Sequence, residues 1–472
     1  MTGKLVVVSN RIPTGATPSG GLVVAVHDAL TRSGGLWVGA HPDEGTPDQD
    51  GLTEIASGDY TRLAFHLTPE EYDSYYLGFA NSVLWPLCHG RVDLVDIERG
   101  FEETYLAVNA RVARLLADQI GEGDIVWVHD YHFLPLASEL RKLGITARIG
   151  FFLHIPFPPL GALSTLPSPD DFAEWLSAYD LVGLQTRRDT ASCLEMFRAD
   201  PRAEFMTDGS VKFRDRSVSV RSFPIGIDAE SFAEAAAVEG PDAELGIDMH
   251  EDLVIGVDRL DYSKGLPNRF RAFGKFLDSR AGTGRRASLL QIAPPTRERV
   301  AAYRAIRTEL EEIAGRLNGE HAELDWTPIR YIHRGVERDT LARLHRRARA
   351  CLVTSLADGM NLVAKEYVAA QDPEDPGVLI LSRFAGAAED MTEALLVNPY
   401  DIDETSEAIE TAITMPLEER RRRHAHSLGV VHATNVTDWA QSFVSCLKTC
   451  TPTLDYRRAQ TGRTLQHDGE TA

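Results

Sequence analysis

Short apolar runs alternate with longer amphipathic stretches along this chain. The runs are rich in Val, Ile and Leu and are mostly continuous rather than alternating, a pattern typical of parallel strands buried on both faces. They predict strands at residues 5–8, 125–128, 149–153, 181–184, 253–257, 289–292, 350–353 and 378–381. Helical stretches such as 137–143 and 299–317 lie between them. The β-α-β order predicts an α/β fold with parallel, doubly wound sheets.

A break in this order divides the chain. Around residues 223–250 the strands give way to a polar, acidic stretch, after which a second β-α series begins. We therefore predict two Rossmann-like domains, residues 1–228 and 229–454, that face a central cleft with ligands at the carboxyl ends of the strands. The last helix, around Trp439, can cross back to the first domain. Residues 455–472 are polar and lack periodicity, which predicts a disordered tail.

Composition places the 472-residue chain among ordinary globular proteins, with 43% hydrophobic and 25% charged residues. Its net charge of −21 argues against nucleic-acid and membrane partners, and phosphate chemistry would need a local cluster of basic residues. No apolar run approaches the roughly 20 residues of a membrane helix, and the N-terminus lacks the apolar core of a signal peptide. The five cysteines are scattered, so we expect a reduced, cytoplasmic protein.

Two loops that follow predicted strands carry groups suited to a phosphate. Arg259 and Lys264 lie five residues apart after the strand at 253–257, where they can aim at one phosphate-bearing group or serve as ordinary surface cations. Residues 358–361 open a helix whose amides and dipole can bind an anion without a metal. Asp358 can alternatively be a simple helix cap. Glu366, eight residues further, can accept hydrogen bonds from ribose hydroxyls.

Histidines follow two other predicted strands. The sequence HDYH at 129–132 follows one strand and His154 follows the next. A metal site is disfavoured because these histidines lie on different strands with aromatic residues between them, and a structural role for His154 stays open. The glycine pair at 20–21 indicates either a backbone that approaches a ligand or an ordinary turn. No GxGxxG follows the first strand, which argues against a nicotinamide or flavin cofactor.

Ten motifs along the chain carry a resemblance to a known family. They are VVVSNRIP, GGL, GLWVG, NSVLWP, HDYH, FFLHIPFPP, FPIGID, RLDYSKGL, DGMNLVAKEYVAAQ and FAGAAEDMTEALLVNP. Over about residues 4–445 the sequence closely resembles the trehalose-6-phosphate synthase family, retaining glucosyltransferases of GT-B architecture. The resemblance implies transfer of glucose from a nucleoside-diphosphate glucose to the anomeric hydroxyl of glucose 6-phosphate, in trehalose biosynthesis and osmoprotection. It implies no cofactor and no metal.

The resemblance also implies which residues form the site. Residues expected to bind the donor are Gly21, Arg259, Lys264, Leu341, Asp358, Gly359, Met360, Asn361, Leu362, Val363 and Glu366. Residues expected to bind the acceptor are Arg11, Tyr76, Trp85, Asp130, Arg297 and Arg338. Residues expected to be catalytic are Asp130, His154, Arg259, Lys264 and Asp358. Because no carboxylate in the motifs is placed as a nucleophile, we expect a front-face reaction in which the leaving diphosphate takes the acceptor's proton.

The sequence departs from the family pattern in two places, and the second leaves the donor base open. Asp258 stands where the family has Glu, and Pro295 stands where a Thr is usual. Pro295 stiffens a loop expected beside the base, so UDP-, GDP- and ADP-glucose all stay possible. A glucosyltransferase with glycerol 3-phosphate or a pseudo-sugar as acceptor, and a catalytically silent regulatory subunit, are the alternatives. Tyr76 and Trp85 favour a hexose phosphate, and homo-oligomerisation stays open.

Overall fold

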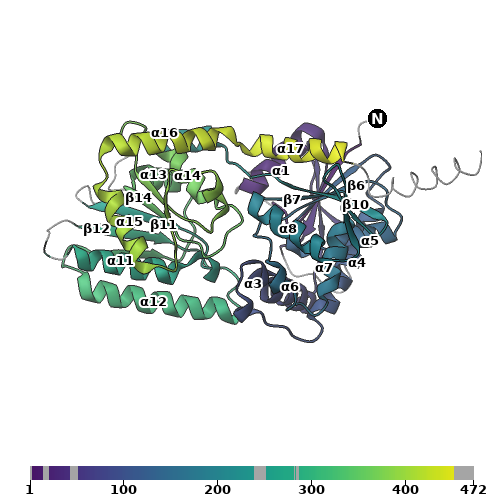
Figure 1. Ribbon diagram of the computed structural model, residues 1–472, viewed down its shortest axis with the longest axis horizontal. Coiled ribbons are helices and arrows are strands. Elements are labelled where there is room, and N and C mark those ends of the chain that lie inside the picture. The colour runs from purple at the N-terminus through teal and green to yellow at the C-terminus, as the bar shows by residue number, and fades with distance from the viewer. Residues whose placement is uncertain are drawn as a thin grey trace, which may run out of the picture. The chain divides into compact units, whose positions relative to one another are not determined.

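The computed structural model describes residues 3–13, 21–42, 51–238, 251–280, 282 and 286–450. The chain forms two compact units, each an α/β body (Figure 1). Unit 1 consists of Met1–Pro224 and Val436–Ala472, and unit 2 consists of Ile225–Asn435. The chain thus enters unit 2 once and leaves it once.

The division differs in two places from the predicted domains. The boundary predicted after residue 228 lies after Pro224, because Ile225 and Ile227 already pair within unit 2 with Lys365 and Asn435. The last helix belongs to unit 1, in agreement with the predicted crossing back, although the predicted second domain extended to residue 454. The predicted tail, 455–472, lies outside the described residues.

Unit 1 is built on a sheet whose strands share a largely parallel arrangement. They are β1 (Leu5–Arg11), β2 (Gly35–Ala40), β3 (Thr53–Ala56), β4 (Thr61–Phe65), β5 (Ile125–His129), β6 (Arg148–Phe152), β7 (Leu181–Leu184), β8 (Ala203–Phe205), β9 (Val211–Phe213) and β10 (Arg216–Ser222). In the described part of the chain their order is β3-β4-β2-β1-β5-β6-β7-β10-β9-β8. Strands β4 to β10 in this order pair in parallel, and β3, β9 and β8 are antiparallel additions at the edges.

Helices cover both faces of the unit 1 sheet. They are α1 (Gly21–Ser33), α2 (Pro69–Glu71), η1 (Tyr72–Leu84), α3 (Trp85–Cys88), η2 (Val92–Leu94), α4 (Phe101–Ala117), η3 (Tyr131–Phe133), α5 (Leu136–Lys142), α6 (Leu160–Leu163), α7 (Pro169–Ser177), α8 (Arg187–Ala199) and α17 (Val436–Thr449). Helix α17 packs against α1 and over β6 and β7. Its Phe443 ring reaches Gly150 and Gly183, where an added Cβ would lie 2.8 and 2.6 Å from the ring atoms. These two strand glycines therefore make room for the last helix.

Unit 2 is built on a parallel sheet. Its strands are β11 (Asp252–Val257), β12 (Ala287–Ile292), β13 (Ile329–Ile332), β14 (Ala350–Val353), β15 (Val378–Ser382) and β16 (Leu395–Val397). In the described residues the order is β13-β12-β11-β14-β15-β16, with every pair parallel. The strand order reverses between β11 and β14. Ligands bind at such a reversal in doubly wound sheets, outside the carboxyl ends of the strands.

The helices of unit 2 lie on both faces of this sheet. They are α9 (Ala229–Ala236), η4 (Tyr262–Lys264), α11 (Leu266–Ser279), α12 (Ala301–His321), α13 (Arg338–Arg347), α14 (Leu362–Ala370), η5 (Gly386–Glu389), α15 (Ile402–Thr414) and α16 (Leu417–Ala433). Figure 1 shows α13 and α14 on one side of β11 and β14, and α11 and α12 on the other. This arrangement confirms the predicted doubly wound fold.

All eight predicted strands are present, and the two predicted helices correspond to α5 and α12. The strands that were not predicted lie mostly towards sheet edges. Most are short and only partly buried, as in β3, β8 and β16, whereas β2 and β10 are longer and lie inside the unit 1 sheet. Continuous burial therefore made the central strands recognisable and left the edges undetected. No described helix is long and apolar enough to cross a membrane.

Candidate active site

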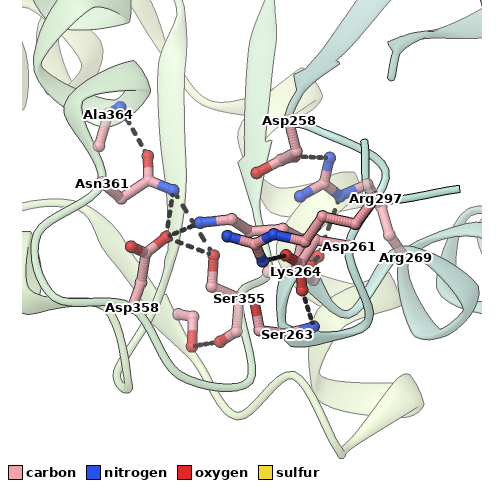
Figure 2. Close-up of polar contacts among 12 residues, drawn as sticks. Asp258, Asp261, Ser263, Lys264, Arg269, Arg297, Ser355, Asp358, Asn361 and Ala364 are labelled. Carbon is pink, nitrogen blue, oxygen red and sulfur yellow. Dashed lines mark hydrogen bonds and ion pairs between the residues drawn. The ribbon is translucent and has the colours of Figure 1, made fainter. Parts of the chain in front are cut away.

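Lys264 and Asp358 meet where the strand order of unit 2 reverses. Lys264 ends the short helix η4 after β11, and Asp358 lies in the loop after β14. The Lys264 Nζ atom is 2.6 Å from Asp358 Oδ2, and each side chain is 13% exposed. Two loops 94 residues apart in sequence thus form one site (Figure 2). The small exposure leaves both charged groups accessible to a ligand while limiting screening by water.

Further hydrogen bonds fix the Asp358 carboxylate. Its Oδ2 atom accepts from Ser355 Oγ at 3.0 Å and from Asn361 Nδ2 at 2.9 Å (Figure 2). With Lys264, three donors converge on one oxygen, two from the loop of Asp358 itself and one from the segment after β11. The position of a carboxylate held in this way is set before any ligand arrives.

The N-terminus of α14 is capped by Asn361 and not by Asp358. Asn361 has a φ of 78°, and its Oδ1 atom accepts from the Ala364 N–H at 3.2 Å. The alternative interpretation of Asp358 as a helix cap is therefore wrong. The first two helical amides, those of Leu362 and Val363, have no acceptor within the helix. Together with the helix dipole they make this end of α14 suited to a phosphate.

Gly359 and Met360 lie buried in the loop that leads to this helix. A second segment, 384–387, holds the loop through its backbone. Asp358 N–H donates to Phe384 O at 3.3 Å, Gly386 N–H donates to Asp358 O at 3.0 Å, and Ala387 N–H donates to Met360 O at 2.8 Å. The motifs DGMN and FAGAAED are thus hydrogen-bonded to each other through their backbones, and the second motif holds the loop formed by the first.

A buried ion pair anchors the loop that carries Arg259. Arg269 Nη1 lies 2.6 Å from Asp258 Oδ2, and both side chains are almost fully buried. Burial raises the pKa of Asp258, and Arg269 opposes that shift. Arg269 Nε also donates to Thr354 Oγ1 after β14, so the pair ties the ends of β11 and β14 together. Asp258 holds this contact although its side chain is one methylene shorter than the family's Glu, and the neighbouring Arg259 is exposed.

Arg297 lies in a buried cluster on the same side of unit 2. Its Nη1 is 3.5 Å from Asp261 Oδ2 and donates to the Tyr303 hydroxyl, which itself donates to Asp261 at 2.9 Å. Asp261 precedes Lys264 by three residues, and Figure 2 shows Arg297 alongside Lys264. The guanidinium is therefore already paired with a carboxylate. Its expected role at the acceptor phosphate stays a prediction.

Glu366 and Arg338 lie on α14 and α13, two helices of unit 2 that pack against each other. Burial raises the pKa of Glu366 on α14 to about 7, while the positive charge of Arg338 opposes that shift. Arg338 begins α13, where it is exposed, donates to Ser231 Oγ at 3.1 Å and lies over the Phe232 ring. Leu341 follows on the same helix and is half-buried. Arg338, expected at the acceptor, thus interacts with a residue expected at the donor.

Lys365 is a buried lysine that the sequence did not single out. Its Nζ donates to Ile225 O at 2.7 Å and to Thr434 Oγ1 at 3.4 Å, and burial lowers its pKa to about 8. Ile225 begins unit 2 and Thr434 lies next to its last residue. One ammonium on α14 therefore fastens both ends of unit 2. A lysine beside a glutamate on a predicted helix is usually solvent-exposed, so nothing in the sequence pointed to this role.

In unit 1, Tyr76 and Trp85 are placed by a π-helix. Element η1 has 13 residues with i to i+5 bonding, and the Trp85 N–H continues this pattern to Ala80 O. Tyr76 and Trp85 are nine residues apart, which is two and a half turns of an α-helix. With about 4.4 residues per turn, a π-helix brings them back to one face. Both rings indeed pack on η3, Tyr76 with His132 at 5.7 Å and Trp85 with Tyr131 at 5.6 Å between centroids.

Arg11 and Asp130 border these aromatic rings. Arg11 ends β1, is exposed, and donates from Nη2 to the Tyr76 hydroxyl at 3.0 Å. Asp130 follows β5 with a φ of 73°, and its Oδ1 accepts from the His154 N–H at 3.2 Å. The predicted acceptor residues Arg11, Tyr76, Trp85 and Asp130 therefore belong to one region of unit 1, which we call the unit 1 cluster together with His154.

His154 follows β6 and is bonded through its ring to a neighbour. Its Nε2 lies 3.1 Å from His129 Nδ1, at the end of β5. Burial lowers the pKa of His154 to about 3. The imidazole is therefore neutral at ordinary pH, and it can hydrogen-bond a sugar without carrying charge. Gly21, expected at the donor, is the first residue of α1.

The predicted site residues thus fall into two sets. The unit 2 cluster comprises Arg259, Lys264, Arg297, Arg338, Leu341, Glu366 and the segment 358–363. Among the described residues, four that are not glycine have a positive φ, namely Asp130, Arg214, Arg297 and Asn361. Three of the four are predicted site residues, and backbone strain of this kind concentrates at functional sites. The partners Asp261 and Tyr303 were missed, although Asp261 lies within the motif that supplied Lys264, and His129 was considered only for a metal site.

One Rossmann-like unit holds cations paired with carboxylates near a helix N-terminus. The other holds aromatic and polar side chains at strand ends. These features define a glycosyltransferase of GT-B architecture. The sequence pattern of glycosyltransferase family 20 matches residues 8–449. The chain belongs to this family.

Curated and solved relatives agree with this assignment. A trehalose-6-phosphate synthase from Sodalis glossinidius is 45% identical over 452 residues, covering 94% of this chain and 96% of the relative. A solved structure from E. coli, bound with UDP-2-fluoro glucose, is 44% identical with a TM-score of 0.90, covering 95% of this chain and all of that one. A UDP-forming α,α-trehalose-phosphate synthase from Burkholderia xenovorans in complex with glucose 6-phosphate is 44% identical with a TM-score of 0.89, covering 94% of this chain and all of that one.

Proposed function

We propose that this glycosyltransferase moves glucose from UDP-glucose to the anomeric oxygen of glucose 6-phosphate, giving α,α-trehalose 6-phosphate and UDP. The observation that carries the proposal is the Lys264–Asp358 pair beside the N-terminus of α14. A fixed ammonium next to free helical amides suits a diphosphate that gains negative charge as it leaves. Names and ligands of relatives at 44–45% identity over nearly the whole chain support the same reaction.

The choice of UDP over GDP rests on the relatives. The E. coli structure holds a UDP sugar and the Burkholderia xenovorans synthase is UDP-forming, each at 44% identity. Pro295 is the one feature of this chain that argues for testing GDP-glucose as well, because a proline removes an N–H and fixes the loop expected at the base.

We propose that chemically different residues bind the diphosphate, the ribose and the glucose of the donor. Arg259, Lys264 and the amides at the start of α14 would bind the diphosphate. Glu366 would accept hydrogen bonds from the ribose, and Asp358 and His154 would bind hydroxyls of the transferred glucose. The arrangement around Asp358 supports this because three donors on one oxygen set the position of the carboxylate beside the start of α14.

We propose that the acceptor is recognised by the flat shape of its sugar ring and by the negative charge of its phosphate. Tyr76 and Trp85, brought to one face by the π-helix, would form planar walls for a hexose. Arg11, fixed by its bond to the Tyr76 hydroxyl, would meet the phosphate together with Arg297. Asp130 would accept from an acceptor hydroxyl.

The reaction we propose retains configuration through a front-face route. The bond from the glucose C1 to the phosphate oxygen breaks, and its electron pair stays on UDP. The acceptor's anomeric oxygen then bonds to C1 on the same face, and its proton passes to the departing phosphate oxygen. The acceptor's proton therefore leaves the site on UDP, and the chain's own contribution is positioning and charge stabilisation by Arg259 and Lys264.

An assay that crosses donors with acceptors tests the proposal. UDP-, GDP- and ADP-glucose are each offered with glucose 6-phosphate and with glycerol 3-phosphate, and nucleotide release is measured. Release of UDP with glucose 6-phosphate, with an α,α-linked product by proton NMR coupling constants, is the expected result. Preferred release with glycerol 3-phosphate would favour a different acceptor. No release with any pair would overturn the enzymatic proposal and favour a regulatory subunit.

A further inference from the structure

His129 is a fully buried histidine that no step proposed above uses. It ends β5, and its Nδ1 lies 3.1 Å from His154 Nε2. The two ring centroids are 5.3 Å apart and the ring planes differ by 23°. That centroid separation is close to the nitrogen–nitrogen distance plus the two ring radii, so the rings lie end to end and nearly in one plane. The contact is therefore an in-plane hydrogen bond.

The ring that donates the hydrogen bond between His129 and His154 must be assigned. Burial lowers the pKa of His129 well below its ordinary value and that of His154 to about 3, so both rings are neutral. A neutral imidazole carries one N–H. Either His129 donates from Nδ1 and His154 then carries its own hydrogen on Nδ1, or His154 donates from Nε2 and His129 carries its hydrogen on Nε2.

The surroundings of His129 Nε2 distinguish these two arrangements. This nitrogen is buried and has no partner among the described residues. The rings of Trp127 and Trp439 pack on His129, with centroids 4.4 and 6.3 Å away, and their indole nitrogens are also buried without an acceptor. An indole nitrogen only donates. A hydrogen on Nε2 would therefore be a buried donor that faces only other donors and has no acceptor. A nitrogen without hydrogen at that position is a buried acceptor without a donor, and leaving an acceptor unpaired costs less free energy than leaving a donor unpaired.

We propose that His129 is a positioning residue that donates from Nδ1 to His154 Nε2 and so keeps the hydrogen of His154 on Nδ1. His154 then offers a neutral N–H donor to an oxygen of a bound sugar, and it cannot accept at that position. Its backbone is fixed as well, because its N–H donates to Asp130 Oδ1 at 3.2 Å. The consequence for glucose binding rests on the proposed function, while the placement of the hydrogen does not.

Nitrogen NMR reads the hydrogen placement directly. Two-bond ¹⁵N–¹H spectra of the full chain with ¹⁵N-labelled histidine are recorded at pH 7, and His129 and His154 are assigned by substitution. Both rings should show the Nδ1–H pattern. His129→Phe removes the donor, and His154 should lose that pattern. His129→Asn places an amide N–H near the position of Nδ1, and the pattern of His154 should return.

Kinetics then test the consequence. His129→Phe should lower kcat at least about tenfold and leave the KM for glucose 6-phosphate unchanged, and His129→Asn should stay within about threefold of wild type. His345→Phe is the matched control, because His345 is equally buried in unit 2, has a pKa lowered to about 3, and has no bonded ring nitrogen among the described residues. It should lower Tm comparably and leave His154 and kcat unchanged.

Each outcome tests either the positioning role of His129 or the proposed function. An Nε2–H pattern for His129 in the wild-type chain would overturn the positioning role, even in an active enzyme. So would a His129→Phe variant that leaves His154 unchanged. If that variant does not fold, the wild-type spectrum and His129→Asn still decide. The Nδ1–H pattern in a chain without synthase activity would overturn the proposed function alone.

Discussion

The two clusters are built from opposite kinds of chemistry. In unit 2 several buried or half-buried cations face carboxylates, as in the pairs Lys264–Asp358, Arg269–Asp258 and Arg297–Asp261. In the unit 1 cluster the groups are mostly neutral rings that contact one another, such as Tyr76 with His132 and Trp85 with Tyr131. Its histidine has a pKa of about 3 and stays uncharged.

This difference matches the demands of the two proposed ligands. A leaving diphosphate needs positive charge at a fixed place, and carboxylates hold the cations there before the ligand binds, so that little reorganisation is needed during the reaction. A hexose offers hydroxyls and flat apolar faces, which are recognised by shape and by neutral hydrogen bonds. A net charge of −21 is thus compatible with anionic substrates, because the basic groups are gathered locally in unit 2.

The largest expected effect comes from breaking a buried pair in each unit. Arg269→Met leaves Asp258 buried without its partner, and Arg141→Met does the same to Asp180 in unit 1, where the pair is 2.9 Å apart. Each should cost about 3–5 kcal/mol of unfolding free energy in urea denaturation. Only Arg269→Met should also weaken UDP binding in calorimetry, since Asp258 adjoins Arg259.

The exposed Arg271 is the matched control for Arg269, because it lies on the same helix and pairs with Glu309 at the surface. Arg271→Met should change stability by less than about 0.5 kcal/mol. Equal losses of UDP binding in the Arg269 and Arg141 variants would show that the effect is general destabilisation, and the distinction between the units would fail.

Lys264→Ala is expected to lower kcat at least about a hundredfold. The substitution removes the cation nearest the proposed leaving group and leaves Asp358 with one donor fewer. Steady-state nucleotide release measures the loss. Lys275→Ala is the control, since Lys275 is an exposed lysine in unit 2 that pairs with Asp403. Activity of the Lys264 variant within a few-fold of wild type would remove Lys264 from the leaving-group role.

The sequence predicted the central strands and the site loops for a shared reason. Buried parallel strands leave continuous apolar runs, and the residues after each run must lie at the carboxyl edge of the sheet. Lys264 and Asp358 could therefore be assigned to loops before any coordinates were known. Their contact could be inferred only from the family resemblance, because 94 residues separate them.

Other parts of the site depend on interactions that no local pattern encodes. The π-helical register of residues 72–84 places Tyr76 and Trp85 on one face, while the usual helical period would have separated them. Lys365 is buried because the two ends of unit 2 offer it a carbonyl and a hydroxyl. Asn361 rather than Asp358 caps α14. Both residue types are good helix caps, so only the surrounding contacts decide between them, and the sequence does not show those contacts.

Trp85→Ala should affect binding of the acceptor and not of the donor, by a smaller factor. The indole is nearly fully buried against Tyr131 and His89, and removing it takes away one planar wall of the unit 1 cluster. The KM for glucose 6-phosphate should rise about tenfold, with the KM for UDP-glucose unchanged, in two-substrate kinetics. Tyr76→Phe keeps the other ring and loses the hydroxyl that accepts from Arg11, so its effect should be a few-fold. A parallel rise in the donor KM would contradict the division between the clusters.

The smallest effect concerns pH and separates the clusters most sharply. The pKa of Glu366 is raised to about 7, so between pH 6 and 8 it changes from neutral to a carboxylate that can accept from both ribose hydroxyls. The KM for UDP-glucose should therefore fall a few-fold as pH rises through 7. The same raised pKa means that stability from Glu366 is present below its unfolded pKa of about 4.3 and is lost as pH rises through 7. Wild type should thus lose stability relative to Glu366→Gln over that range.

Glu366→Gln also supplies the control for ionisation of the substrates. A sugar phosphate itself titrates near about pH 6, so the informative quantity is the ratio of variant to wild-type KM at each pH. That ratio should rise with pH for UDP-glucose and stay flat for glucose 6-phosphate, because the pKa of His154 in the unit 1 cluster is about 3 and its ring does not titrate in this window. A ratio that stays flat for UDP-glucose would remove Glu366 from the ribose. A ratio that changes for the acceptor would mean that the pH response belongs to both clusters.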